Sequence, residues 1–412
     1  MNATRRQFLK TSLAGGSLVS LGATVPAFLS RTAAAAPEAD RPGARDTILV
    51  VVQLTGGNDG LNTVIPYTDP EYAKLRPTLR IPKDQVQKLD DSVGLHPAME
   101  RLAKLLDDRA LAVVQGVGYP NPNQSHFRSM DIWQAGSTAA TLTEGWLGKA
   151  LKKMPAAPAF HLAGSNDASP LALAGAPARV PTISSLGDFQ LQVTAASGAD
   201  TREQRAVIEG VAQGGGQPGL LDFVQRTAAN TYASSRRLQE VGKNYQPKVP
   251  YPNSALANHL KVAAQLIDGG LGARLFYVSI GNFDTHANQL NTHANLLRQL
   301  SEAMTAFYQD MAARGHKDRI LMMTFSEFGR RAQENGSRGT DHGAAAPMLL
   351  VGGKVQPGVV GRHPSLTDLA LGNLKHAVDF RQVYATILEG WLGVPSREVL
   401  GEKFQTVSLL HG

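Results

Sequence analysis

The sequence of 412 residues contains no cysteine. Disulfide bonds are therefore excluded, and so are thiolate ligands for a metal ion. Any metal that the protein binds has to be held by carboxylate oxygens and imidazole nitrogens. This absence directs attention to aspartate, glutamate and histidine as the side chains that carry chemistry.

The chain also lacks a cluster of lysine and arginine residues with interleaved aromatic residues, so we expect no nucleic-acid partner. Its formal charge of +7 overstates how basic the folded part is. The predicted leader holds no acidic residue, and without its basic residues the charge is +3; these are Arg5, Arg6, Lys10 and Arg31. A G-x-S-x-G motif is absent as well, which argues against a serine esterase with a Ser-His-Asp triad.

The N-terminus has the features of an export signal. The segment TRRQFLK is typical of a twin-arginine signal, and a moderately apolar stretch and the small residues of SRTAAAAP follow it. The apolar stretch is rich in glycine and serine and shorter than the roughly 20 residues of a membrane span, so we expect no stable membrane anchor. We predict a signal peptide over residues 1–36 and export of the folded protein by the twin-arginine translocase to the periplasm or the medium.

Residues 37–412 are predicted to form a single α/β domain. Short apolar runs, typical of buried strands, alternate with segments that have the apolar spacing of helices. The runs lie at 48–54, 109–118, 273–281, 319–327 and 347–353, and the helical segments at 96–108, 253–272, 293–315 and 379–394. This alternation predicts a three-layer sandwich, with a mostly parallel sheet and helices on both faces. We interpret residues from about 150 to about 250 as an insertion that decorates the domain, with short strands and loops over 150–200.

Polar residues that suit metal binding recur beside the predicted strands. In an open parallel sheet, ligands bind outside the carboxyl ends of the strands. Five segments bring carboxylates, imidazoles and a hydroxyl to that edge, and the residues are Asp59, Ser125, His126, Asp284, His286, Glu327, Asp341 and His342. Such ligands suit Zn²⁺ or Mn²⁺. Two divalent ions roughly 3.5–4 Å apart would clamp an ester oxyanion and activate a nucleophile.

Each of these residues also has a purely structural interpretation, as a turn residue, a helix cap, an interior histidine or part of a surface loop. Asp59 could make an Asx-turn, and Asp284 could cap the helix that follows it. Glu327 could pair with Arg330 or Arg331. The shared position of the candidates at strand ends is what favours the metal site.

These motifs resemble a known family. The segments LTGGNDGLNTVIPY, SHFRSMDIW, FDTHANQ, TFSEFGRR and GTDHGAAAPMLLVGG, behind a twin-arginine leader, are similar to the bacterial family known as domain of unknown function 1501. That family in turn resembles the alkaline phosphatase superfamily, which includes sulfatases, phosphopentomutases and cofactor-independent phosphoglycerate mutases. The resemblance implies an alkaline-phosphatase-like fold and one or two divalent ions of Zn, Mn or Ca.

The resemblance also implies a role for each candidate. Ser125, at a predicted helix N-terminus, matches the nucleophile of the superfamily, and the helix dipole would favour a developing alkoxide there. His126 and Arg128 are expected to contact the oxyanion, Arg128 through two hydrogen bonds. The expected metal ligands are Asp59, Asp284, His286, Glu327, Asp341 and His342.

One position departs from the superfamily pattern. Where the superfamily has Asp-His, this chain has Glu327-Phe328, so an imidazole ligand is missing unless His126 replaces it. A formylglycine derived from cysteine is excluded because the chain has no cysteine, whereas the serine version stays open. We therefore expect a metal-dependent hydrolase of phosphate or sulfate esters, with Ser125 or a metal-activated water as the nucleophile. The alternative is a non-catalytic fold that binds an envelope component or a partner protein.

Overall fold

The computed structural model describes residues 46–154, 157–164, 167–186 and 240–411. The predicted signal peptide, residues 1–36, lies outside the described residues, and so does 187–239, the larger part of the predicted insertion. None of the helices in the described ranges has the length and apolar character that a membrane span requires.

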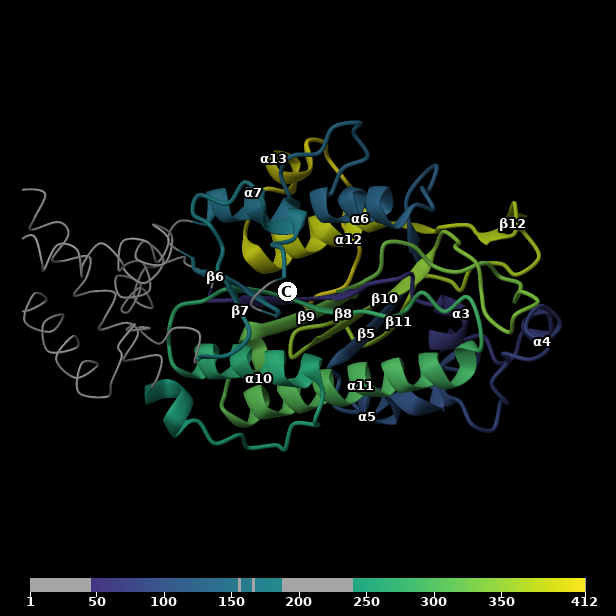
Figure 1. Ribbon diagram of the computed structural model, residues 1–412, viewed down its shortest axis with the longest axis horizontal. Helices are drawn as coiled ribbons and strands as arrows, with labels where there is room; N and C mark the ends of the chain where they lie inside the picture. Colours follow the sequence, from purple (N-terminus) through teal and green to yellow (C-terminus); the bar gives the residue numbers. More distant parts are fainter. Residues whose placement is uncertain (1–45, 155–156, 165–166, 187–239, 412) are drawn as a thin grey trace, which may run out of the picture.

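A nine-stranded sheet forms the centre of the molecule (Figure 1). Its strand order is β11-β5-β10-β9-β1-β8-β6-β7, and β14 pairs with β5. The strands are β1 (Ile48–Leu54), β5 (Leu111–Gly118), β6 (Ala159–Leu162), β7 (Thr182–Ile183), β8 (Leu275–Ile280), β9 (Ile320–Phe325), β10 (Ala346–Gly352), β11 (Gly358–Val360) and β14 (Val378–Asp379). Only β10 runs antiparallel to its neighbours β9 and β5, and the other pairings are parallel.

Strand β1 shows why the sequence forms this sheet. All seven of its residues, ILVVVQL, are buried, as expected for a strand covered on both faces. Because successive side chains of a strand point to opposite faces, Val50 and Val52 pack into one hydrophobic core and Leu49 and Val51 into the other. The predicted run at 48–54 matches β1 residue for residue.

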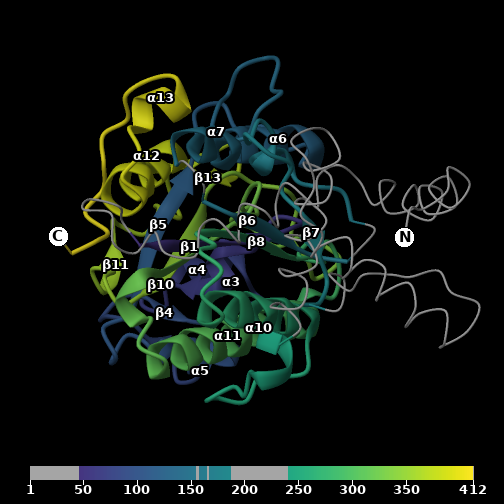
Figure 2. The ribbon, with the colours of Figure 1, turned by 90° about the vertical axis from the view of Figure 1, so that its left-hand side faces the viewer.

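Helices cover both faces of the sheet (Figures 1 and 2). One layer contains α5 (Glu100–Ala103), α10 (Ala255–Asp268) and α11 (Gln289–Ala313), and the other contains α6 (His126–Ala135), α7 (Trp146–Lys153), α12 (Phe380–Thr386) and α13 (Ser396–Leu400). The predicted three-layer α/β sandwich is therefore confirmed. The helix predicted over 96–108 is shorter than expected, because a 3₁₀ turn, Pro97–Met99, precedes α5 and further turns follow it.

The start of the predicted insertion belongs to the main sheet. Strand β6 pairs with β8, and β7 pairs with β6, both in parallel. The two strands therefore extend one side of the central sheet, and the predicted boundary at residue 150 is too early. The sequence pattern predicts short strands here as a decoration of the domain, and the pairing with β8 makes them part of its main sheet.

The carboxyl ends of β1, β8 and β9 meet at one edge, where α3 (Gly60–Thr63), α4 (Pro70–Leu75) and a β-hairpin gather (Figure 1). The hairpin is formed by β12 (Leu369–Ala370) and β13 (Asn373–Leu374), and a small sheet of β2 (Val64–Ile65), β4 (Gly94–Leu95) and β3 (Gln87–Lys88) is also present. Because β10 runs antiparallel to its neighbours, its first residue lies at this same edge, and so does the end of the segment that precedes it. The direction of β10 therefore lets the GTDHG motif join the loops that follow the parallel strands.

Candidate metal centre

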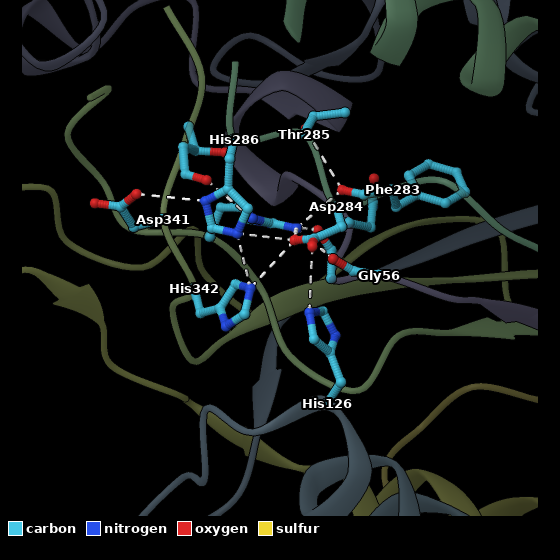
Figure 3. A network of polar contacts seen from close by, with 12 residues as sticks. Gly56, His126, Phe283, Asp284, Thr285, His286, Asp341 and His342 are labelled. Atoms are coloured by element: carbon cyan, nitrogen blue, oxygen red, sulfur yellow. Dashed lines mark hydrogen bonds and ion pairs between the residues drawn. The ribbon is translucent and has the colours of Figure 1, made fainter. Parts of the chain in front are cut away.

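Four side chains from three distant segments meet at this edge of the sheet. His126 is the first residue of α6, Asp284 and His286 lie in the loop after β8, and His342 lies just before β10. Figure 3 shows the three imidazole rings arranged around the carboxylate of Asp284. We call these four residues the histidine–aspartate cluster.

The cluster is held together by short distances to Asp284. Oδ1 of Asp284 lies 3.0 Å from Nε2 of His286 and 3.1 Å from Nε2 of His342, and Oδ2 lies 3.5 Å from Nε2 of His126. The Nε2 atoms of His286 and His342 are themselves 3.0 Å apart. One potential ligand atom each from His126, Asp284 and His342 can be chosen so that all three lie within 4.8 Å of one another, so this group can hold a metal ion.

The opposite nitrogen of each ring faces an acceptor. Nδ1 of His126 lies 2.9 Å from Oε1 of Glu327, and Nδ1 of His342 lies 2.9 Å from the carbonyl oxygen of Gln124. Since a carboxylate or carbonyl oxygen only accepts, these contacts place a proton on each Nδ1 and direct the Nε2 atom toward Asp284. Metal-binding histidines have this arrangement in proteins.

A buried arginine fixes the carboxylate. Arg330 is 1% exposed and donates a hydrogen bond of 2.7 Å to Oδ1 of Asp284. Its remaining donors bind the carbonyl oxygens of Gly56, Gly57, Phe283 and Thr340, so that it joins the loops after β1 and β8 to the segment before β10. Partial burial alone would raise the pKa of Asp284, but the hydrogen bond and the positive charge of Arg330 outweigh it and lower the pKa to about 2.

Two glycines allow the loops to approach so closely. Gly56 has φ +118°, and a Cβ atom there would lie 2.5 Å from the backbone nitrogen of Asp284. A Cβ atom on Gly339 would lie 2.1 Å from the carbonyl carbon of His286. The segments TGGND and GTDHG therefore both need glycine at these positions, because a side chain there would collide with the backbone of the loop after β8.

The structure gives Asp59 a different role from the predicted metal ligand. Its carboxylate is buried and accepts two hydrogen bonds from Arg76, at 2.6 and 2.9 Å, and one from Gln289. Burial raises the pKa of Asp59, but Arg76 outweighs burial and lowers the pKa to about 2. With both oxygens occupied by an arginine, Asp59 holds the GGND loop in place and is not available to the cluster.

Two other predicted ligands stand behind the cluster. Glu327 is fully buried, and its Oε1 accepts from the backbone N–H of Gly56 at 2.8 Å as well as from His126. Oδ1 of Asp341 lies 3.5 Å from Nδ1 of His286 and accepts a hydrogen bond from Asn335. The structure corrects the prediction here, because both carboxylates contact the far nitrogen of a histidine and so orient the ring.

The remaining candidates lie on α6. Ser125 is the exposed N-cap residue, and its hydroxyl makes no capping hydrogen bond. Arg128 donates to the carbonyl oxygen of Ala139, beyond the end of α6. Its bidentate contact with an oxyanion stays a prediction. The buried hydroxyl of Ser129 donates to the backbone carbonyl oxygen of Glu327, and this hydrogen bond connects α6 to the residue that orients His126.

Sequence reasoning missed Arg330 and Gln124 as residues of the site. Arg330 was noted only as a partner for Glu327, and the structure pairs it with Asp284 instead. Gln124 acts through its backbone carbonyl, so its side-chain type carried no signal. His126, which the sequence offered as a replacement for the imidazole missing at Phe328, does lie beside Glu327.

The family model described as Protein of unknown function (DUF1501) matches residues 46–406. The chain belongs to this family. The membership predicted from the sequence motifs is thereby confirmed, and the matched range includes every residue of the histidine–aspartate cluster. No curated protein matches the sequence significantly.

Several solved structures are similar to this DUF1501 protein. One is a protein in the alkaline phosphatase superfamily from Vibrio parahaemolyticus, with 10% identity, a TM-score of 0.40, and coverage of 91% of this chain and 77% of the other. The lipoteichoic acid synthase LtaP from Listeria monocytogenes has 10% identity, a TM-score of 0.34 and coverage of 89% and 74%. The PsFucS1 sulfatase from Pseudoalteromonas sp. has 12% identity, a TM-score of 0.35 and coverage of 92% and 72%. What the protein does has to follow from its own side chains.

Proposed function

We propose that the protein is an exported zinc-dependent hydrolase of phosphate or sulfate esters. The observation that supports this most strongly is the set of three imidazole Nε2 atoms directed at one carboxylate. The carboxyl edge of a mostly parallel sheet is also where such folds bind their ligands.

The side chains fit a metal ion better than they fit protons alone. The Nε2 atoms of His286 and His342 are 3.0 Å apart, and both cannot carry protons, because two N–H groups on two cationic rings would then face each other. At least one of these two Nε2 atoms therefore directs its lone pair at the other nitrogen and at the anionic carboxylate of Asp284. A cation between these atoms removes the repulsion.

The distances also suit zinc. Zinc bonds of about 2.0–2.1 Å in a tetrahedron place neighbouring ligand atoms about 3.3 Å apart. The separations of Asp284 from the three imidazoles, and of His286 from His342, are 3.0 to 3.5 Å, and His126, Asp284 and His342 form the group whose ligand atoms all lie within 4.8 Å of one another. A set of three imidazoles and one carboxylate favours Zn²⁺ over Ca²⁺, which prefers oxygen ligands. A bound ion would supply Lewis acidity and neutralise negative charge that develops on an ester oxygen.

The chain's own residues would position the cluster and supply the nucleophile. Arg330 keeps Asp284 ionised, and Glu327 accepts from Nδ1 of His126 and so directs its Nε2 atom toward Asp284. The Ser125 hydroxyl stands at the N-terminus of a ten-residue helix, whose dipole favours a developing alkoxide. Ser125 is therefore our candidate nucleophile, and a water molecule is the other candidate.

Metal content provides the first test. The mature protein is purified after export, dialysed and analysed by mass spectrometry for zinc, manganese and calcium, together with Asp284→Asn and His342→Ala. The matched control is His411→Ala, which changes an exposed histidine near the C-terminus. We expect zinc in the wild type and the control and a loss in both site variants. Equal metal in all four proteins would contradict the proposal.

Activity provides the second test. The zinc-loaded protein is assayed with 4-nitrophenyl phosphate, bis(4-nitrophenyl) phosphate and 4-nitrophenyl sulfate. Turnover that disappears in Ser125→Ala, while zinc stays bound, identifies a serine nucleophile; turnover that survives identifies water. Zinc binding without any turnover would instead favour the non-catalytic alternative, a fold that binds an envelope component or a partner protein.

Export is a separate part of the proposal and rests on the TRRQFLK segment. Fractionation of cells that produce the full chain should place the protein in the periplasm or the medium. The double substitution Arg5→Lys and Arg6→Lys should retain it in the cytoplasm, since the twin-arginine translocase reads the arginine pair. Unchanged export of this variant would exclude the twin-arginine route.

A further inference from the structure

Two large exposed apolar side chains among the described residues belong to segments that adjoin the cluster. Among the described residues, three large hydrophobic side chains are exposed, namely Phe127 at 86%, Leu290 at 39% and Leu371 at 93%. Phe127 directly follows His126, and Leu290 lies in the first turn of α11, four residues after His286. Single exposed apolar residues are ordinary on a protein surface, but Phe127 adjoins His126 in the chain and Leu371 lies in a hairpin bonded to Gln124, so both belong to segments of the site.

Leu371 is exposed in an unfavourable backbone conformation. It and Gly372 form the two-residue turn between β12 and β13, with φ values of +54° and +82°. A two-residue turn with positive φ at both positions strongly favours Asn-Gly or Gly-Gly, because other side chains are strained there. Leu371 therefore lowers the stability of the fold in two ways, through its strained backbone conformation and through the exposure of its side chain to water. Such a residue is a candidate for function.

The hairpin is anchored beside the cluster. The N–H of Ala332 donates to the carbonyl oxygen of Gly372 at 3.1 Å, and the side chain of Gln124 donates to that of Asn373 at 3.2 Å. Gln124 is the residue whose carbonyl oxygen accepts from His342. The hairpin that carries Leu371 is therefore bonded to the same short segment, 124–127, that supplies His126 and Phe127.

We propose that Phe127 and Leu371 form an apolar rim that binds the hydrocarbon part of the substrate while the histidine–aspartate cluster binds its anionic group. The substrate class would then be a phosphate or sulfate monoester of an alkyl, acyl-chain or aryl group. The ester of a free sugar would leave both side chains in water. This inference rests on the proposed function, because it takes the cluster as the place where the anionic group binds.

Two phosphonates test the rim without any need for turnover. Binding of methylphosphonate and hexylphosphonate to the zinc-loaded protein is measured by calorimetry. Burial of the additional methylene groups against the rim should make hexylphosphonate bind at least about tenfold more tightly. Phe127→Ser and Leu371→Asn should each reduce this preference severalfold and leave methylphosphonate affinity unchanged. Leu410→Asn changes a partly buried leucine beside Val355, at the opposite edge of the sheet, and as a control it should keep the preference.

Leu371→Asn has a second readout that separates binding from structure. The substitution creates an Asn-Gly pair in a turn that favours it, so we expect a higher thermal midpoint together with weaker hexylphosphonate binding. A residue with only a structural role would not lose affinity while the protein gains stability.

The outcomes of these measurements separate the apolar rim from the proposed metal-dependent function on which it rests. Equal affinity for the two phosphonates would overturn the rim and leave the metal-dependent site in place. No binding of either phosphonate would overturn both. Equal affinity combined with weaker sedimentation of the Phe127→Ser variant with phosphatidylglycerol vesicles would replace the rim with a membrane-docking surface.

Discussion

Arg76 and Asp59 form an ion pair that is shielded from water, and breaking it tests the structural role assigned to Asp59. Their side chains are 0% and 1% exposed. Besides the two hydrogen bonds to Asp59, Arg76 donates to the carbonyl oxygens of Ala332 and Arg331 at 2.7 and 2.9 Å. The substitution Arg76→Met keeps much of the apolar stem but removes all four hydrogen bonds.

The expected loss of stability follows from the charge left behind. Asp59 would keep only the hydrogen bond from Gln289. Removing one partner of a buried ion pair costs about 3–5 kcal/mol, because the other charge stays buried without compensation. Domains are stable by about 5–15 kcal/mol. We therefore expect Arg76→Met to fold in the absence of denaturant but to lose about 4 kcal/mol of unfolding free energy.

Urea unfolding followed by tryptophan fluorescence measures this loss as a lower midpoint at an unchanged slope. The double variant Arg76→Met/Asp59→Asn buries no unpaired charge, so it should recover about 2 kcal/mol relative to Arg76→Met. Asp59→Asn should bind as much zinc as the wild type, because Asp59 contacts Arg76 and Gln289. A loss below about 1 kcal/mol for Arg76→Met, which is typical of a surface site, or a zinc-free Asp59→Asn would refute the reasoning.

Three further predictions concern the support of the cluster, pH and metal. Glu327→Gln removes the charge that holds His126, so zinc affinity measured by competition with a chelator should fall about tenfold; unchanged affinity would show that the charge has no role. The pKa of Asp59 is about 2 in the folded chain against 3.8 for an unperturbed aspartate, so its stabilisation is present above pH 3.8 and is lost as the pH falls toward 2. Acid unfolding of Arg76→Met/Asp59→Asn should lack that component, and identical acid profiles for variant and wild type would contradict it. Free zinc at 1,000 times its Kd should stabilise the protein by about 4 kcal/mol, seen as a higher thermal midpoint than in EDTA; equal midpoints would mean that no ion binds the folded state.

The sequence was sufficient for the fold class, and it indicated the edge of the sheet at which several of the candidate side chains lie. The apolar runs identified β1, β5, β8, β9 and β10 to within a few residues, because a strand buried on both faces has to be apolar along its whole length. The sequence predicted short strands in the region of β6 and β7 but not their place in the main sheet, because two to four residues are too few to show which strand they pair with. Aspartate and histidine beside several strand ends marked one edge of the sheet, since parallel strands end on the same side.

The tertiary structure decided which of the candidates meet. His126 and Glu327 are 201 positions apart, and the pairing of their side chains depends on how α6 packs against the end of β9. The residues of β10 do not determine whether the strand runs parallel or antiparallel to its neighbours, yet its antiparallel direction brings His342 to Asp284. Asp59 and Glu327 looked alike as acids that follow strands, but one is held by Arg76 and the other holds His126. Local sequence fixes which groups are available, whereas the partner of each buried charge is set by the packing of distant segments.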